Sequence, residues 1–121
     1  MRNLGLIVEV NMDDMMTQRL VDLMKLLEED PNDSFLLFAI AKEYENQGLL
    51  DQAEHYYLTL YKSNPSYVGL YYHLAKLYES KGMVEEALNY YDEGIFMANK
   101  MHDQHALAEL KNAKTNLELM I

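Results

Sequence analysis

The sequence offers few side chains that are suited to catalysis or to binding a metal. His102 and His105, with Asp103 between them, come closest to a metal site, but this short run at a predicted helix start supplies too few ligands. The serines lie near predicted helix ends without a nucleophile-elbow motif, and the chain has no phosphate-binding loop and no dinucleotide fingerprint. We therefore expect no enzyme activity, no metal and no cofactor.

The composition narrows the classes of partner. The chain of 121 residues carries 20 Asp and Glu against 10 Lys and Arg, a net charge of −10, which argues against nucleic acid and anionic membranes as partners. Half of the residues are hydrophobic, which is enough for a folded core, and Cys is absent, so no disulfide is possible. Because no apolar run reaches the roughly 20 residues of a membrane span, we expect a soluble, cytoplasmic protein.

Identical residues recur at a spacing of 34 positions through the middle of the chain. Such a period is typical of helical repeat proteins, in which each repeat is one helix-turn-helix unit. The recurring pairs are Pro31 and Pro65, Leu36 and Leu70, Ala41 and Ala75, Lys42 and Lys76, Tyr44 and Tyr78, Glu45 and Glu79, Gly48 and Gly82, Ala53 and Ala87, Tyr56 and Tyr90, and Tyr57 and Tyr91.

Apolar periodicity predicts helices over almost everything after residue 14. Asn32 and Ser66 are expected to cap the helices that follow each proline, and Gly48 and Gly82 to end them. Residues 1–14 lack this pattern and are expected to form a flexible tail or a start-site extension. The expected helices cover 15–29, about 33–46, 50–63, 67–80, 84–100 and 104–120. The domain 15–121 then divides into a leading helix (15–30), two repeats (31–64 and 65–99) and a C-terminal capping helix (100–121).

The pattern Leu37, Ile40-Ala41, Tyr44, Gly48, Ala53, Tyr57 and Pro65, with its second copy, resembles the tetratricopeptide repeat. The resemblance implies an all-α fold in which antiparallel helix pairs stack as a short right-handed superhelix. It also implies a protein-interaction module that binds a peptide or partner segment in a concave groove lined by the first helix of each repeat. Leu60 and Gly94 stand where the family prefers Ala, and Asn99 stands in place of Pro, so we expect weaker local geometry there.

The resemblance also indicates the groove residues. Phe38 and Tyr72 are expected to stack as an aromatic floor with a cationic strip beside it, which suits an apolar peptide that carries a carboxylate. Alternatively, Lys42 pairs with Glu45 and Lys76 with Glu79 as ordinary helical ion pairs, and the aromatic residues pack against a cap or the tail. The Lys and Asn carboxylate clamp of chaperone-binding members is not reproduced. The candidate groove residues are Phe35, Phe38, Lys42, Tyr72, His73 and Lys76.

Tyrosines on the second helix of each repeat leave another reading open. Tyr57 and Tyr91 fall on core positions, whereas Tyr56 and Tyr90, with Tyr61 and Phe96, lie nearer the convex side. These four pack between repeats or, if they are exposed together, form a self-association patch. The alternatives to a peptide-binding module are therefore a homodimeric structural protein and an accessory subunit of an enzyme encoded elsewhere.

Overall fold

A computed structural model describes residues 17–121 of the chain, and every regular element in that range is an α-helix. The predicted tail (1–14) and the first residues of the predicted leading helix lie outside the described residues. The all-α fold predicted from the sequence is confirmed. The helices are α2 (Gln18–Glu29), α3 (Ser34–Asn46), α4 (Leu50–Ser63), α5 (Gly69–Ser80), α6 (Val84–Lys100) and α7 (Gln104–Met120).

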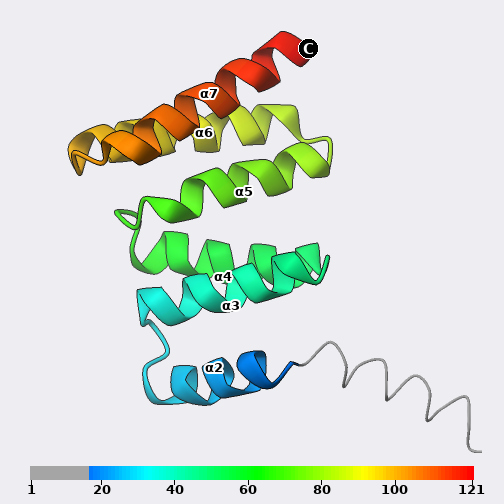
Figure 1. Cartoon of the computed structure of the whole chain (residues 1–121), viewed down its shortest axis with the longest axis vertical. Coiled ribbons are helices and arrows are strands. Elements are labelled where there is room, and N and C mark those ends of the chain that lie inside the picture. Colours follow the sequence, from blue (N-terminus) through cyan, green and yellow to red (C-terminus); the bar gives the residue numbers. More distant parts are fainter. Residues whose placement is uncertain (1–16) are drawn as a thin grey trace, which may run out of the picture.

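The helices stack one after another without closing around a common centre. Figure 1 shows α3, α5 and α7 on the near side of the stack, with α4 and α6 behind them. α3 packs against α4 and α5 against α6, as antiparallel pairs, while α2 covers α3 at one end and α7 covers α5 and α6 at the other. The order is that of a superhelical repeat protein, in which each unit contacts its neighbours.

Two of the predicted helix caps are wrong. Asp33, not Asn32, caps α3, because its carboxylate accepts a hydrogen bond from the Leu36 amide three residues on, at 2.9 Å. Ser66 donates instead to the Asn64 side chain, and α5 begins only at Gly69, after a turn closed by the Asn64 carbonyl. Asp103 caps α7 as expected, through the amide of Ala106.

Three turns between helices share one geometry. Gly48 and Gly82 adopt φ of 77° and 75°, and the following amides of Leu49 and Met83 donate back into the helix they leave. This is the Schellman arrangement, which uses a left-handed residue to end a helix. In the third turn the left-handed residue is His102, with φ of 59°, and the hydrogen bond pattern is the same. The predicted role of the two glycines is confirmed.

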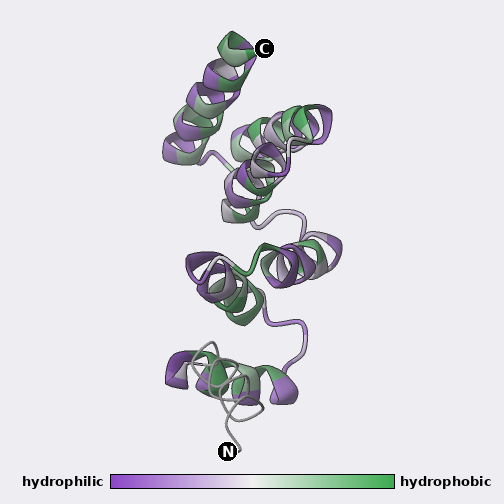
Figure 2. Cartoon of the chain, turned by 90° about the vertical axis from the view of Figure 1, so that its right-hand side faces the viewer, coloured by the Kyte–Doolittle hydropathy of each residue, from purple (hydrophilic) through white to green (hydrophobic). Residues whose placement is uncertain are grey.

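The buried apolar side chains form a large cluster from α3 to α7 and a smaller one between α2 and α3, joined by partly buried side chains. Figure 2 shows that hydrophobic and hydrophilic residues share each helix, as expected for amphipathic helices that bury one face. Tyr57 and Tyr91 are fully buried, as predicted, with the small residues Ala53 and Ala87 beside them in the core.

Gly94 has a packing role that the sequence did not indicate. A Cβ added to Gly94 would lie 2.6 Å from the Cβ of Tyr71, closer than atoms can approach. Glycine therefore lets α6 lie directly against α5 where the large Tyr71 side chain is buried. The departure from the family's Ala accommodates a neighbour rather than weakening the local geometry.

Within residues 17–121, no helix combines the length and the apolar character that crossing a bilayer would require.

Candidate binding face

The predicted groove residues lie on α3 and α5, on the side of the stack that also carries α7. We call this side the binding face. It holds two hollows. The first, the α3–α5 hollow, has a volume of about 440 Å³. The second, the α5–α7 hollow, has a volume of about 320 Å³.

The α3–α5 hollow has the Phe38 ring in its wall. Tyr67, Val68 and Gly69 line it from the start of α5, and Met101 and Asp103 line it from the turn before α7. Gly69 has no side chain to cover Phe38, since an added Cβ would touch the ring edge at 3.5 Å. The start of α5 therefore leaves the aromatic ring open to a ligand.

Aromatic side chains surround Phe38. Its ring centroid lies 5.2 Å from that of Tyr67, 6.0 Å from that of Tyr57 and 5.5 Å from that of His73. The predicted stack of Phe38 on Tyr72 does not form; each ring instead makes an edge contact with the His73 imidazole. Phe38 and Tyr72 occupy equivalent positions of the two repeats, but α3 and α5 are far enough apart for the His73 ring to lie between them.

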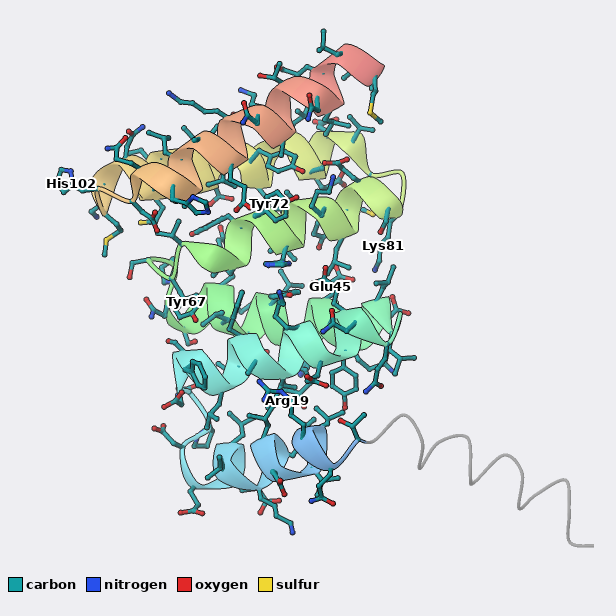
Figure 3. The ribbon with its side chains drawn as sticks, in the orientation of Figure 1. Arg19, Glu45, Tyr67, Tyr72, Lys81 and His102 are labelled. Atoms are coloured by element: carbon teal, nitrogen blue, oxygen red, sulfur yellow. The ribbon has the colours of Figure 1, made fainter. Side chains whose placement is uncertain are left out.

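A hydrogen-bonded network fixes His73. Glu45 accepts a hydrogen bond from the Tyr57 hydroxyl at 2.6 Å, and its carboxylate lies 3.2 Å from Nδ1 of His73. The His73 ring also stacks on Tyr57, with 9° between the ring planes. Burial alone would raise the pKa of Glu45, but the hydrogen bonds from His73 and Tyr57 outweigh it and lower that pKa. Figure 3 shows Glu45 in the space between α3 and α5.

This network determines the tautomer of His73. Because Nδ1 donates its proton to an ionised carboxylate, a neutral His73 carries a lone pair on Nε2. Nε2 makes no hydrogen bond within residues 17–121 and is not a fully buried atom. A neutral His73 can thus accept a hydrogen bond at this position, and only its protonated form can donate one.

The α5–α7 hollow contains Tyr72 and Lys76. Lys76 lies 3.7 Å from Glu79, which confirms the alternative of a helical ion pair for this lysine. Glu109 also lines the hollow, so the charge around Lys76 is mixed. The rest of the wall comes from α7: Asn112, Ala113, Asn116, Leu117 and Met120.

The remaining predicted residues lie on α3. Lys42 has its ammonium 6.0 Å from the centroid of the Phe38 ring, and no carboxylate within residues 17–121 forms an ion pair with it. Phe35 is 65% exposed. The structure thus groups Phe38, Lys42 and His73, and places Tyr72 with Lys76 in the neighbouring hollow.

Several residues of this face were not predicted. Tyr67 and Met101 come from turns, and Asn112 and Asn116 come from α7, which the sequence predicted only as a capping helix. Their polarity was visible in the sequence, but their position beside α5 depends on how the last helix turns back.

His102 lies in the turn before α7, and His105 lies in the first turn of that helix. Within the described part of the chain, no three His, Asp or Glu side chains are grouped as metal ligands would be. Figure 3 shows His102 at the α6–α7 turn, extending away from the ribbon.

Comparisons with known proteins identify similar sequences and structures. A sequence model of the tetratricopeptide repeat matches residues 36–67 and 68–99. A tetratricopeptide repeat domain protein from Salinibacter ruber is 35% identical over 74% of this chain and 99% of its own, with a TM-score of 0.72. None of the curated proteins compared matches the chain.

Two more distant structures share the fold. A protein from Bordetella parapertussis is 21% identical over 87% of this chain and 91% of its own, with a TM-score of 0.75. The type III secretion translocator chaperone SycD of Yersinia enterocolitica is 16% identical over 97% of this chain and 84% of its own, also with a TM-score of 0.75.

Proposed function

The chain belongs to the tetratricopeptide repeat family, whose fold serves protein–protein interaction, and we propose that its binding face holds a peptide or partner segment. Proteins of this family are generally non-enzymatic scaffolds, which agrees with the lack of a catalytic motif in the sequence. The translocator chaperone with the same fold acts, by its name, on another protein. We propose that this chain likewise binds a protein partner.

The exposed aromatic surface of α3 is the observation that carries this proposal. Phe35 is 65% exposed, and the ring of Phe38, one turn further along α3, lines a hollow of about 440 Å³. Transfer of apolar surface out of water is favourable by about 25 cal/mol per Å², from which the cost of ordering the two partners is subtracted. The α3–α5 hollow is therefore the place where an apolar side chain of the partner docks, and Tyr72 extends the apolar contact toward α7.

The three basic residues of the binding face differ in how readily they can bind an acidic group. Lys42 forms no ion pair within the described residues, although its charge contributes to lowering the pKa of Glu45, whereas Lys76 is paired with Glu79. His73 can donate to a carboxylate only in its protonated form, because its Nδ1 proton is committed to Glu45. Lys42 is thus the main contact for a carboxylate, and Lys76 and His73 assist it.

A pull-down with charge-reversed baits tests the proposal. The groove variant combines Lys42→Glu with Lys76→Glu. The matched control combines Lys62→Glu with Lys100→Glu, which makes the same change of charge at exposed positions of α4 and α6. Loss of the Lys76 pair and repulsion from Glu79 cost only a few tenths of a kcal/mol each, so both variants remain folded by circular dichroism.

We expect a protein that wild type and control retain and that the groove variant loses, with at least about a tenfold weaker affinity when the purified pair is titrated. Equal retention by all three baits contradicts the proposed site. If light scattering then shows a dimer that dissociates on dilution, the homodimeric alternative replaces it.

A further inference from the structure

A third hollow, the α4–α6 pocket, opens on the opposite side of the stack. Its volume is about 370 Å³, and its walls combine aromatic and acidic side chains. Tyr61 comes from α4 and Tyr71 from α5, while Asp92, Glu93 and Phe96 come from consecutive turns of α6. None of these residues belongs to the binding face.

The aromatic rings of this pocket are held open. Phe96 is 65% exposed, so its ring is available to a ligand. The Tyr61 ring meets the buried Tyr71 edge to face, with 6.0 Å between the centroids. The Tyr71 hydroxyl in turn donates to the Pro65 carbonyl at 2.5 Å, which fixes the floor of the pocket.

Glu93 supplies the available negative charge. Its Oε1 accepts a hydrogen bond from the Tyr61 hydroxyl at 2.6 Å, which orients the carboxylate beside the ring. Its Oε2 has no hydrogen-bond or ion-pair partner within residues 17–121. Asp92, by contrast, is neutralised by Lys114 of α7 at 2.6 Å. One oriented carboxylate and exposed aromatic rings thus meet in one pocket.

The preceding helices α2, α3 and α4 show that the fold does not require these side chains. At the positions 34 residues earlier, Leu27 and Leu37 replace the two tyrosines, Thr59 replaces Glu93 and Lys62 replaces Phe96. Both repeats form the same kind of helix pair, so Tyr71, Glu93 and Phe96 of the second repeat are not needed for that shape. The pocket is thus a feature of the junction between α4 and α6, with a chemistry that the earlier junction lacks.

We propose that the α4–α6 pocket binds an arginine side chain of a protein partner, at a site separate from the binding face. A guanidinium is planar and permanently charged, so it can stack on an aromatic ring and bind a carboxylate at the same time. The Tyr61 and Phe96 rings offer the stacking surface and Oε2 of Glu93 the acceptor. A basic segment of the partner also complements a chain with a net charge of −10.

A peptide titration followed by nuclear magnetic resonance tests this site. The probe is a short capped peptide with one central arginine flanked by Gly and Ala, and its control carries citrulline, the neutral isostere of arginine. The protein variants are Glu93→Gln, which keeps an acceptor for Tyr61, and Phe96→Lys, which installs the residue of the first repeat. Glu85→Gln, an exposed change of the same charge at the start of α6, is the matched control.

We expect the arginine peptide to shift the amide resonances around Glu93 and Phe96 in a saturable way, and the citrulline peptide to leave them unchanged. Glu93→Gln weakens the binding about threefold to tenfold, Phe96→Lys abolishes it and Glu85→Gln has no effect. Equal binding of the two peptides overturns the proposal. So does a loss with Glu85→Gln as large as that with Glu93→Gln, since this would show general attraction to an acidic protein.

Discussion

The two full repeats have the same fold, but they differ in the sizes of the two side chains that meet where their helices cross. In the first repeat the two equivalent positions hold Leu37 and Leu60, both buried. In the second they hold Tyr71 and Gly94, one large and one without a side chain. A core tolerates such an exchange as long as the total volume is preserved. The residue at one position is therefore understood only together with its neighbour across the helices.

The exchange also changes the surface. Tyr71 is buried, yet it reaches the edge of the α4–α6 pocket and anchors the Pro65 carbonyl there. The smaller Leu37 has no hydroxyl to do so. A difference in the core of the second repeat thus supports a difference on its outer side.

The strongest test of this comparison is an alanine substitution at the equivalent positions of α4 and α6, which are residues 60 and 94. Leu60→Ala removes a fully buried side chain and leaves a cavity, so we expect a loss of about 2–5 kcal/mol in the free energy of unfolding. Gly94→Ala places a Cβ against Tyr71 and forces α5 and α6 apart, at a cost of about 1–3 kcal/mol. Urea unfolding measures both. A stabilised Gly94→Ala variant, as expected from helix propensity alone, would refute the close approach of these helices.

The junction between the repeats differs from the junction before α7 in its charge. Glu54 accepts hydrogen bonds from Tyr78 and Lys81 across the α4–α5 junction, whereas the equivalent residue of the second repeat is Leu88. Burial alone would raise the pKa of Glu54, but the hydrogen bonds from Lys81 and Tyr78 outweigh it and lower that pKa below its usual 4.5. The stabilisation by ionised Glu54 is therefore complete above pH 4.5 and disappears as the pH falls further.

We expect Glu54→Gln to reduce the free energy of unfolding by up to about 1 kcal/mol at pH 7, because the pair is partly exposed. The difference from wild type should shrink as the pH falls below 4.5 and wild-type Glu54 becomes protonated. Thermal unfolding across this pH range provides the measurement, with exposed Glu28→Gln on α2 as the control. A difference that persists unchanged at low pH would mean that the charge of Glu54 is not what stabilises the junction.

Substitution of His102 in the turn between α6 and α7 is expected to change the free energy of unfolding least. His102 occupies the left-handed position that Gly48 and Gly82 fill in the other turns, and a side chain there is strained. We expect His102→Gly to raise the free energy of unfolding by roughly 0.5 kcal/mol. Gly82→Ala, where no atom lies within 4 Å of an added Cβ, should lower it by about 1 kcal/mol through backbone strain alone. A destabilised His102→Gly variant would show that the imidazole makes a useful contact at this turn.

The sequence predicted those features that depend on spacing along one helix or between repeats. The period of 34 residues placed the ends of most helices, because each Gly sits where a left-handed residue ends a helix. The same period placed Tyr57 and Tyr91 in the core. Such features need only a local rule and an aligned copy.

The arrangement of the candidate sites could not be predicted in the same way. Phe38 and Tyr72 are equivalent by repeat, but whether their rings touch depends on the distance between α3 and α5, which the His73 ring fills. The role of Gly94 depends on Tyr71, 23 positions earlier, and the contribution of Asn112 on the direction of α7. These are contacts between separate helices, and one sequence without related sequences does not specify them.

The stacked order of the helices has a consequence for how the chain opens. Every pair of helices in substantial contact is adjacent in the chain or separated by a single helix, so no late segment holds down an early one. Opening can then proceed one helix at a time from either end of residues 17–121, with different free energies for different amides. Hydrogen exchange should reveal a gradient, with the slowest amides in α5, which contacts α4, α6 and α7, and the fastest in α2.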